Sequence, residues 1–261
     1  MVAGQAAADA AARARHLPKL GVGLHLVLTR GRPVSDPGKI PDIVGSDGMF
    51  ARDLFRAGMN FFFNPAARAQ LAVEIRAQFD AFRKTGLKLD HVNGHNHIHL
   101  HPTVLAMVLE IGHEFGLAAV RLPYEPPLVS FGAMGEGLWR RLLPALGLWP
   151  WTAQLKRRLR RSGFACNDRV FGLYDSGHMT AARVSQFVSH LPEGVSEIYS
   201  HPSITVWEGA DEAAEGYDGP GEYAALTDPA IQQAIRDRRI ARIVFSDLCA
   251  RPDPVLKAPA H

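Results

Sequence analysis

Five of the twelve histidines in the sequence lie in one short stretch, at every second position from 91 to 101 except 93, where Asn93 stands. They are His91, His95, His97, His99 and His101. If the stretch is extended, alternate side chains share a face, so Asn93, His95 and His97 would point the same way. Neutral imidazole is the commonest metal ligand and the usual proton carrier near neutral pH. The spacing therefore predicts a metal or catalytic site; the alternative is a solvated histidine-rich turn.

His25 also stands in an unusual place, because it interrupts the apolar run 20–29. A polar group buried in such a run must find a partner or a ligand, since burial without one is costly. Taken alone, His25 is explained more simply as a core histidine satisfied by a hydrogen bond than as a functional residue.

The elements that must position these residues follow an alternating pattern. Short apolar runs predict buried strands at 20–29, 87–92, 118–122, 170–174, 195–200 and 242–245. Helical spacing and capping residues predict helices at 4–16, 65–85, 102–115, 179–190 and 227–238, the last with Thr227 as its N-cap. Strand and helix in alternation predict an α/β fold with a parallel sheet, and at 261 residues a (β/α) barrel.

The remaining polar candidates stand at the ends of these predicted strands. They are His25, His95, Arg121, His201 and Asp247. In a barrel the carboxyl ends of the strands face one mouth, where active sites are built. We expect these residues to converge there, and this convergence is stronger evidence than any single histidine.

Composition narrows the class of protein. The formal net charge of +3 is mildly basic and implies no nucleic-acid partner, and the two cysteines stand in unrelated contexts. Their sparseness fits a reducing compartment. No apolar run reaches membrane-spanning length, and the start shows no signal peptide. We therefore expect a cytoplasmic enzyme.

Residues 124–168 interrupt the alternation, as an insertion in a single domain over 1–261. The insertion holds three of the four tryptophans and five basic residues between 156 and 161. Trp beside Lys and Arg is typical of a helix lying on an anionic membrane, which predicts peripheral contact through 138–161. The alternative is that the aromatic residues pack on the barrel. Pro144, Gly147 and Pro150 are expected to break the segment into short helices.

Three motifs, in chain order, resemble the YdjC-like carbohydrate deacetylases, and most closely their hopanoid-biosynthesis-associated branch. They are Gly23–Thr29, Asp90–Pro102 and Tyr199–Pro202. The resemblance implies a distorted (β/α) barrel that hydrolyses the acetamide of an N-acetylated amino sugar. For this branch the substrate would be an N-acetylglucosaminyl hopanoid lipid, and a homodimer is an expectation that the sequence leaves open.

The resemblance also assigns metal ligands, and the chemistry of amide hydrolysis suggests roles for other residues. One divalent metal would be held by His25 and His95 together with an Asp, and the family points to Mg²⁺, whereas imidazole ligands suit Zn²⁺ better. His201 would be the general acid or a substrate contact. Arg121 would contact the sugar or the oxyanion, and His97 would contact the substrate or orient a ligand. His99 and His101 are expected in a solvated turn.

The sequence departs from the family at its front. Relatives open with an Asp-Asp-Phe-Gly motif that supplies the third ligand and the base, whereas this sequence has no Asp-Asp pair. Met1–Gly4 resembles the tail of the family's second strand, so the first strand and helix are expected to be missing. The missing motif favours a rival interpretation, a catalytically inactive sugar- or lipid-binding barrel. A second rival is another metal-dependent barrel hydrolase, which would want more carboxylate ligands than the strand ends offer. We expect the chain as written to be a poor enzyme.

Overall fold

The computed structural model describes residues 1–205 and 216–249, which form an α/β fold with parallel strands. Two compact units are distinguished, and each is described by itself. The first contains Met1–Arg121, Leu159–Cys166 and residues 243–249, and the second contains Leu122–Arg158 and the described part of Asn167–Arg242. The predicted α/β class with parallel strands is confirmed, and the single domain over 1–261 stays a prediction.

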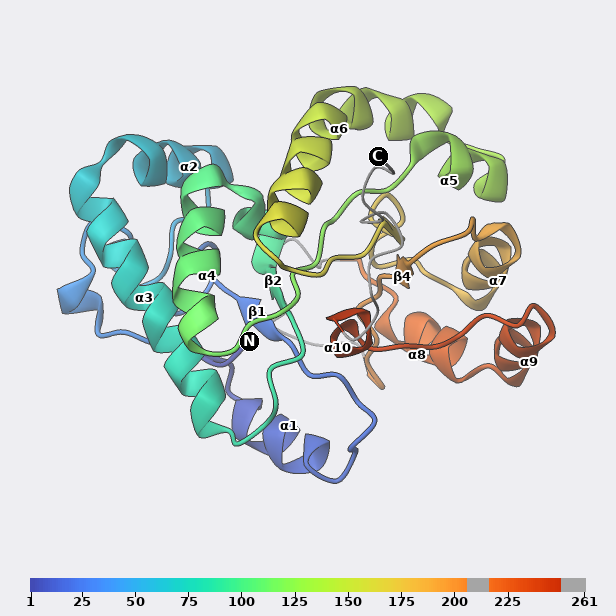
Figure 1. Cartoon of the computed structure of the whole chain (residues 1–261), viewed down its shortest axis with the longest axis horizontal. Coiled ribbons are helices and arrows are strands. Elements are labelled where there is room, and N and C mark those ends of the chain that lie inside the picture. The colour runs from blue at the N-terminus through green and yellow to red at the C-terminus, as the bar shows by residue number, and fades with distance from the viewer. Residues whose placement is uncertain (206–215, 250–261) are drawn as a thin grey trace, which may run out of the picture. The chain divides into compact units, whose positions relative to one another are not determined.

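The first unit holds two short parallel strands, β1 (Leu24–Leu26) and β2 (Val92–Gly94), whose register pairs His25 with Asn93. Its helices are α1 (Ala7–Ala14), η1 (Pro37–Lys39), α2 (Leu54–Phe63), α3 (Pro65–Lys84), η2 (His95–Leu100), α4 (Pro102–Glu114) and α10 (Phe245–Cys249). Helices α2, α3 and α4 pack against one another, and α3 also packs on β1 (Figure 1).

Helix α3 shows how local sequence sets these elements. Asn64 caps it by accepting hydrogen bonds from the backbone N–H groups of Ala66 at 3.0 Å and Ala67 at 3.3 Å. Pro65 takes the first helical position, and Gly86, just beyond the end, has a φ of +72° that favours glycine. The buried apolar face of the helix is Leu71, Ile75, Phe79 and Phe82.

The second unit contains a parallel pair, β3 (Arg169–Phe171) and β4 (Ser196–Ile198). Its helices are α5 (Pro127–Met134), α6 (Leu138–Arg161, the last three residues of which belong to the first unit), α7 (Ala181–His190), α8 (Gly219–Thr227) and α9 (Pro229–Asp237). Its apolar core includes Phe171, Met179, Phe187 and Ile231. Helix α8 has no counterpart among the predicted helices.

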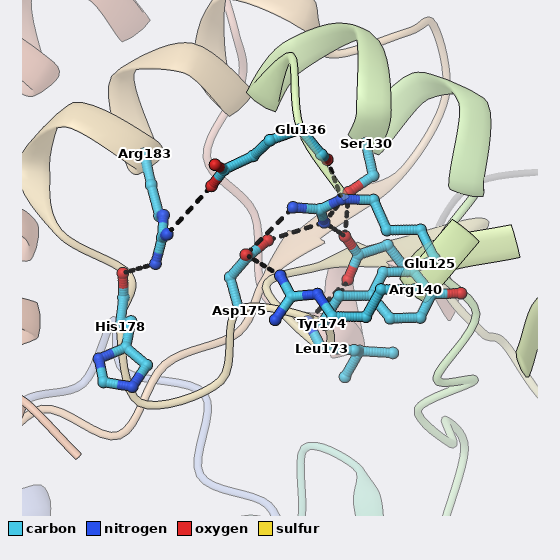
Figure 2. Close-up of polar contacts among 10 residues, drawn as sticks. Glu125, Ser130, Glu136, Arg140, Leu173, Tyr174, Asp175, His178 and Arg183 are labelled. Atoms are coloured by element: carbon cyan, nitrogen blue, oxygen red, sulfur yellow. Dashed lines mark hydrogen bonds and ion pairs between the residues drawn. The ribbon is translucent and has the colours of Figure 1, made fainter. Parts of the chain in front are cut away.

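A buried ion cluster holds α5 and α6 to the segment that follows β3 (Figure 2). The guanidinium of Arg141 is fully buried and contacts Asp175 at 2.8 and 3.1 Å, Ser130 at 2.6 Å and Glu125 at 3.5 Å. Glu125 also accepts a hydrogen bond from the backbone N–H of Leu173 at 2.7 Å. The charges of Arg141, Glu125 and Asp175 are thus compensated inside the unit, as buried charges must be.

Two expectations about the helices are wrong. Helix α6 runs for 24 residues through Pro144 and Pro150 instead of breaking into short pieces. Packing overrides local propensity here, since Arg141 and the apolar side chains of Leu155 and Leu159 are buried. Thr227 is the last residue of α8, and Asp228 caps α9 instead, by accepting a hydrogen bond from the backbone N–H of Ala230 at 2.7 Å.

The strand predictions differ in outcome. The strand expected over 87–92 begins only at Val92, and the one expected over 118–122 is reduced to isolated bridges at Ala119 and Val120. The strand expected over 242–245 is wrong, because α10 begins at Phe245. Backbone N–H groups there donate to the carboxylate of Asp90 rather than to a neighbouring strand.

Candidate active site

His25 lies in the middle of β1, directly beside Asn93 of β2. Its Nδ1 is 2.7 Å from the side-chain amide of Asn93. Gln78 of α3 pairs with both backbone groups of Val27, at 3.0 Å to its N–H and 2.6 Å to its carbonyl oxygen. Helix α3 therefore fixes the end of the strand that carries His25.

Burial keeps His25 neutral. It lowers the pKa of His25 to about 3, because the charged imidazolium would lose its hydration inside the unit. A neutral imidazole retains one nitrogen with a free electron pair, which is the form that binds a metal or accepts a proton.

His95 follows β2 directly and begins η2. Its ring centre is 5.7 Å from that of His25, with the two ring planes at 73°. After His95 the chain curls, because Asn96 and His97 take positive φ angles of 49° and 56°. The histidine row is therefore not extended beyond the end of β2, and the shared face that extension would give does not form. A φ of this kind is uncommon outside glycine, although Asn and His adopt it more readily than most residues.

The curl buries His99, which was expected in a solvated turn. His99 is fully buried, and its Nε2 lies 2.9 Å from the backbone oxygen of Arg121, to which it donates. Burial lowers the pKa of His99 to about 3. Gly94 makes this packing feasible, because a Cβ at that position would lie 2.9 Å from Nδ1 of His99.

The expectation that His101 lies in a solvated turn is also wrong. It occupies the position before α4, and its ring lies 6.1 Å from that of Phe61 and 6.2 Å from that of Phe62, both on α2. Burial lowers the pKa of His101. Two of the five histidines of the row thus serve to pack the turn rather than to face solvent.

Two residues of the stretch that had no role assigned from the sequence, Asp90 and Asn93, are prominent in the structure. Asp90 accepts from the backbone N–H groups of Phe245 and Ser246 and contacts Nδ1 of His91 at 3.0 Å. Asn93 lies between His25 and the guanidinium of Arg121. Asn93 breaks the row of histidines, and that break was the available signal.

His97 and Arg121, the two predicted substrate contacts, also belong to the first unit. The ring of His97 is 6.3 Å from that of His99, and the backbone oxygen of Arg121 is held by His99. The structure thus gathers His25, His95 and Arg121 around Asn93 and the turn that follows it.

His201 belongs to the second unit, where it has its own partners. Its Nε2 is 2.8 Å from the hydroxyl of Tyr199, and its ring centre is 5.0 Å from that of Tyr217. Its backbone N–H donates to the buried carboxylate of Glu222. Glu222 also accepts from the backbone N–H of Met179 at 2.9 Å, so α8 fixes the backbone of the predicted acid.

Asp247 has a local structural contact. Its carboxylate accepts a hydrogen bond from the backbone N–H of Val244 at 3.0 Å, at the start of α10. It belongs to the first unit.

His25 and His95 offer a divalent metal two nitrogen ligands. Their edge-to-face rings lie on β1 and directly after its partner strand β2, and the neutral form of His25 suits coordination. Within residues 1–205 and 216–249, no group of three or more His, Cys, Asp or Glu side chains is arranged to hold a metal ion. The two imidazoles therefore suit a metal as two of its ligands, and the remaining ligands would have to come from other groups.

None of the described helices combines the length and the apolar character needed to cross a membrane.

The chain matches the family described as YdjC-like protein over residues 1–237. It is 30% identical over 242 residues to a carbohydrate deacetylase of Brevibacillus brevis, covering 90% of this chain and 81% of the relative. It is 28% identical to a carbohydrate deacetylase of Vibrio vulnificus, over 97% of this chain and 84% of the relative.

A solved structure from Enterococcus faecalis V583, of a candidate cellobiose-phosphate cleavage protein, shares the fold. The TM-score is 0.68 at 19% identity, over 95% of this chain and 85% of that one. The family match spans most of the chain and includes all three motifs. The chain therefore belongs to the YdjC-like protein family.

Proposed function

We propose that this chain is a carbohydrate deacetylase, a hydrolase that cleaves the acetamide of an N-acetylated amino sugar. The observation that carries the proposal is the pairing of His25, on β1, with His95, directly after the parallel strand β2, in a chain whose curated relatives are named carbohydrate deacetylases. Amide hydrolysis needs an activated water and stabilisation of the oxyanion.

His25 and His95 would hold one divalent metal, Mg²⁺ by family resemblance or Zn²⁺ by ligand type. When bound, the metal would polarise the amide carbonyl and acidify a water molecule. Arg121 would donate hydrogen bonds to the sugar or the developing oxyanion, and His97 would contact the substrate. His201, oriented by the hydroxyl of Tyr199, would give a proton to the departing amine.

For the substrate we propose an N-acetylglucosaminyl hopanoid lipid, approached from the inner face of the membrane. An exposed apolar stripe on α6 supports this placement. Its members are 58–68% exposed and lie at helical spacing: Trp139, Leu143, Leu146 and Trp149. Four basic residues near the end of the same helix are also exposed: Arg157, Arg158, Arg160 and Arg161.

Apolar side chains beside arginines suit the surface of an anionic bilayer, to which each basic residue contributes about 1 kcal/mol. Lys156 is the exception among the basic residues, because it forms an ion pair with Asp168 at 2.6 Å.

Membrane contact is tested by co-sedimentation with vesicles of anionic and of zwitterionic lipid. Neutralising the four arginines between 157 and 161 to Gln should release the chain from the anionic vesicles. A matched variant that neutralises four exposed arginines elsewhere (Arg236, Arg238, Arg239 and Arg242) should stay bound. Equal binding of the two variants to anionic vesicles, or no binding by the wild type, would contradict the proposed membrane contact.

The deacetylase proposal is tested by following acetate release from N-acetylglucosamine oligomers. We expect release that stops on chelation and returns when Mg²⁺ or Zn²⁺ is added. Sugar binding without acetate would favour the inactive sugar-binding barrel instead, and release of another product would favour the other hydrolase class.

A further inference from the structure

The side-chain amide of Asn93 lies between an imidazole and a guanidinium. One end of the amide is 2.7 Å from Nδ1 of His25. The other end is 2.8 and 3.2 Å from the two terminal nitrogens of Arg121. Asn93 is buried, so water does not take over either contact easily.

The chemistry of the partners decides which end is which. A guanidinium can only donate hydrogen bonds, so the atom facing Arg121 must be the amide oxygen. The amide nitrogen then faces His25, and Nδ1 of His25 must be the acceptor. The end at Arg121 also lies 3.4 Å from Nε2 of His91, which is too long to outweigh the shorter contacts. In this arrangement the single ring proton of neutral His25 sits on Nε2.

A metal requires the opposite arrangement. A histidine that binds a metal through one nitrogen usually donates its other N–H to a carboxylate or a carbonyl oxygen. In His25, Nδ1 is engaged by Asn93, which leaves Nε2 for the metal. Nδ1 would then carry the proton and would need an acceptor, but Asn93 presents its NH₂ group.

We infer that Asn93 is a positioning residue that determines which ring nitrogen of His25 carries the proton. In consequence, metal binding at His25 competes with the hydrogen bond between Asn93 and Arg121. Its one amide oxygen serves Arg121 or His25, but not both. Metal binding through Nε2 of His25 would therefore turn the amide and break the contact with Arg121. A carboxylate at position 93 would accept from both residues and remove the conflict. The inference rests on the proposed function in its use of a metal at His25 and His95.

The first test titrates Zn²⁺ into the intact metal-free chain by calorimetry. Partners of metal-binding histidines typically change metal affinity by about 10–100-fold. We expect Asn93→Asp to bind Zn²⁺ about tenfold or more tightly than the wild type. Asn96→Asp is the matched control, because it adds the same charge on the neighbouring turn, and it should stay near the wild-type affinity. Equal affinity of wild type and Asn93→Asp, or an equal gain in the control, would overturn the inference.

The second test reads the tautomer directly, by nitrogen NMR of the histidine rings in the metal-free chain. His25 should carry its proton on Nε2 in the wild type and on Nδ1 in Asn93→Asp. A wild-type His25 protonated on Nδ1 would overturn the inference, and so would a failure of all three chains to bind Zn²⁺. If the tautomers and affinities are as expected but no acetate is released, only the proposed function fails.

Discussion

The carboxylate of Asp90 accepts a hydrogen bond from the backbone N–H of Ser246 at 2.8 Å, across 156 positions of the sequence. The bond joins the segment that leads into the histidine row to the start of α10. Asp90 also accepts a hydrogen bond from the backbone N–H of Phe245. The N–H groups of Phe245 and Ser246 are therefore not available to pair with a neighbouring strand, which agrees with the absence of the strand predicted over 242–245.

We predict that Asp90→Asn destabilises the chain by about 2 kcal/mol at pH 7, because charge-assisted hydrogen bonds are worth roughly 1.5–3 kcal/mol. Burial raises the pKa of Asp90, but hydrogen bonds from His91 and Ser246 outweigh it and lower the pKa to about 2. The stabilisation is therefore present above the unfolded pKa of about 3.9 and is lost as pH falls through 2. Urea unfolding at pH 7 and at pH 2–3 measures it.

The control for this prediction is Asp9→Asn, which removes an exposed ion pair with Arg13. Such a pair contributes little, so this variant should unfold like the wild type. If the Asp90 variant loses no more stability than the control at pH 7, its contact with Ser246 is not stabilising.

His99 makes the chain sensitive to mild acid. Its pKa is lowered to about 3 by burial, whereas an unfolded histidine titrates near 6.5. Below pH 6.5 the unfolded state binds a proton that the folded state does not, so stability falls as pH falls from 6.5 toward 3. The loss from this residue is up to about 1.4 kcal/mol per pH unit.

We expect His99→Gln to have a shallower loss of stability between pH 6.5 and 5 than the wild type. At pH 7.5 the variant should be less stable by about 1–3 kcal/mol if the backbone oxygen of Arg121 loses its partner. Thermal unfolding at several pH values gives both quantities. Identical pH slopes for the two proteins would contradict the burial of a neutral His99.

Arg141 is the centre of the ion cluster of the second unit, and its removal leaves the buried Glu125 without its guanidinium partner and Asp175 with the exposed Arg140 alone. We predict that Arg141→Met destabilises the chain by about 3–5 kcal/mol. Arg140→Met is the matched control, because its side chain also pairs with Asp175 but is 59% exposed. The control should cost less than about 1 kcal/mol. Urea unfolding compares them, and a similar cost for both variants would contradict the assigned role.

The sequence predicts α3 and α4 well, because their apolar spacing and their first-turn prolines are local, whereas it wrongly predicts breaks in α6. Helix α3 begins at Pro65 as predicted, since Asn64 and Pro65 mark its start within the sequence itself. The strands are harder to predict, because β1 and β2 have three residues each and depend on partners far along the chain. Contacts such as that of Asp90 with Ser246 leave no trace in local sequence.

In the candidate site, too, local features could be predicted from the sequence and long-range contacts could not. The types and spacing of the histidines marked the right segment, and His25 and His95 lie near each other in one unit. Spacing alone does not reveal the backbone conformation of the row, in which left-handed residues Asn96 and His97 turn the chain and His99 is buried. The role of Asn93 depends on Arg121, which stands 28 positions later, and no local pattern connects the two residues.

The central claim is that His25 and His95 together support hydrolysis of an acetamide on an amino sugar. The most direct measurement counts acetate and free amine released from N-acetylglucosamine oligomers by the wild type, by His95→Ala and by His113→Ala. His113 is an exposed histidine on α4 and serves as the matched control. The account predicts one amine for each acetate in the wild type and the control, and loss of both products in His95→Ala. Undiminished acetate release by His95→Ala would contradict it.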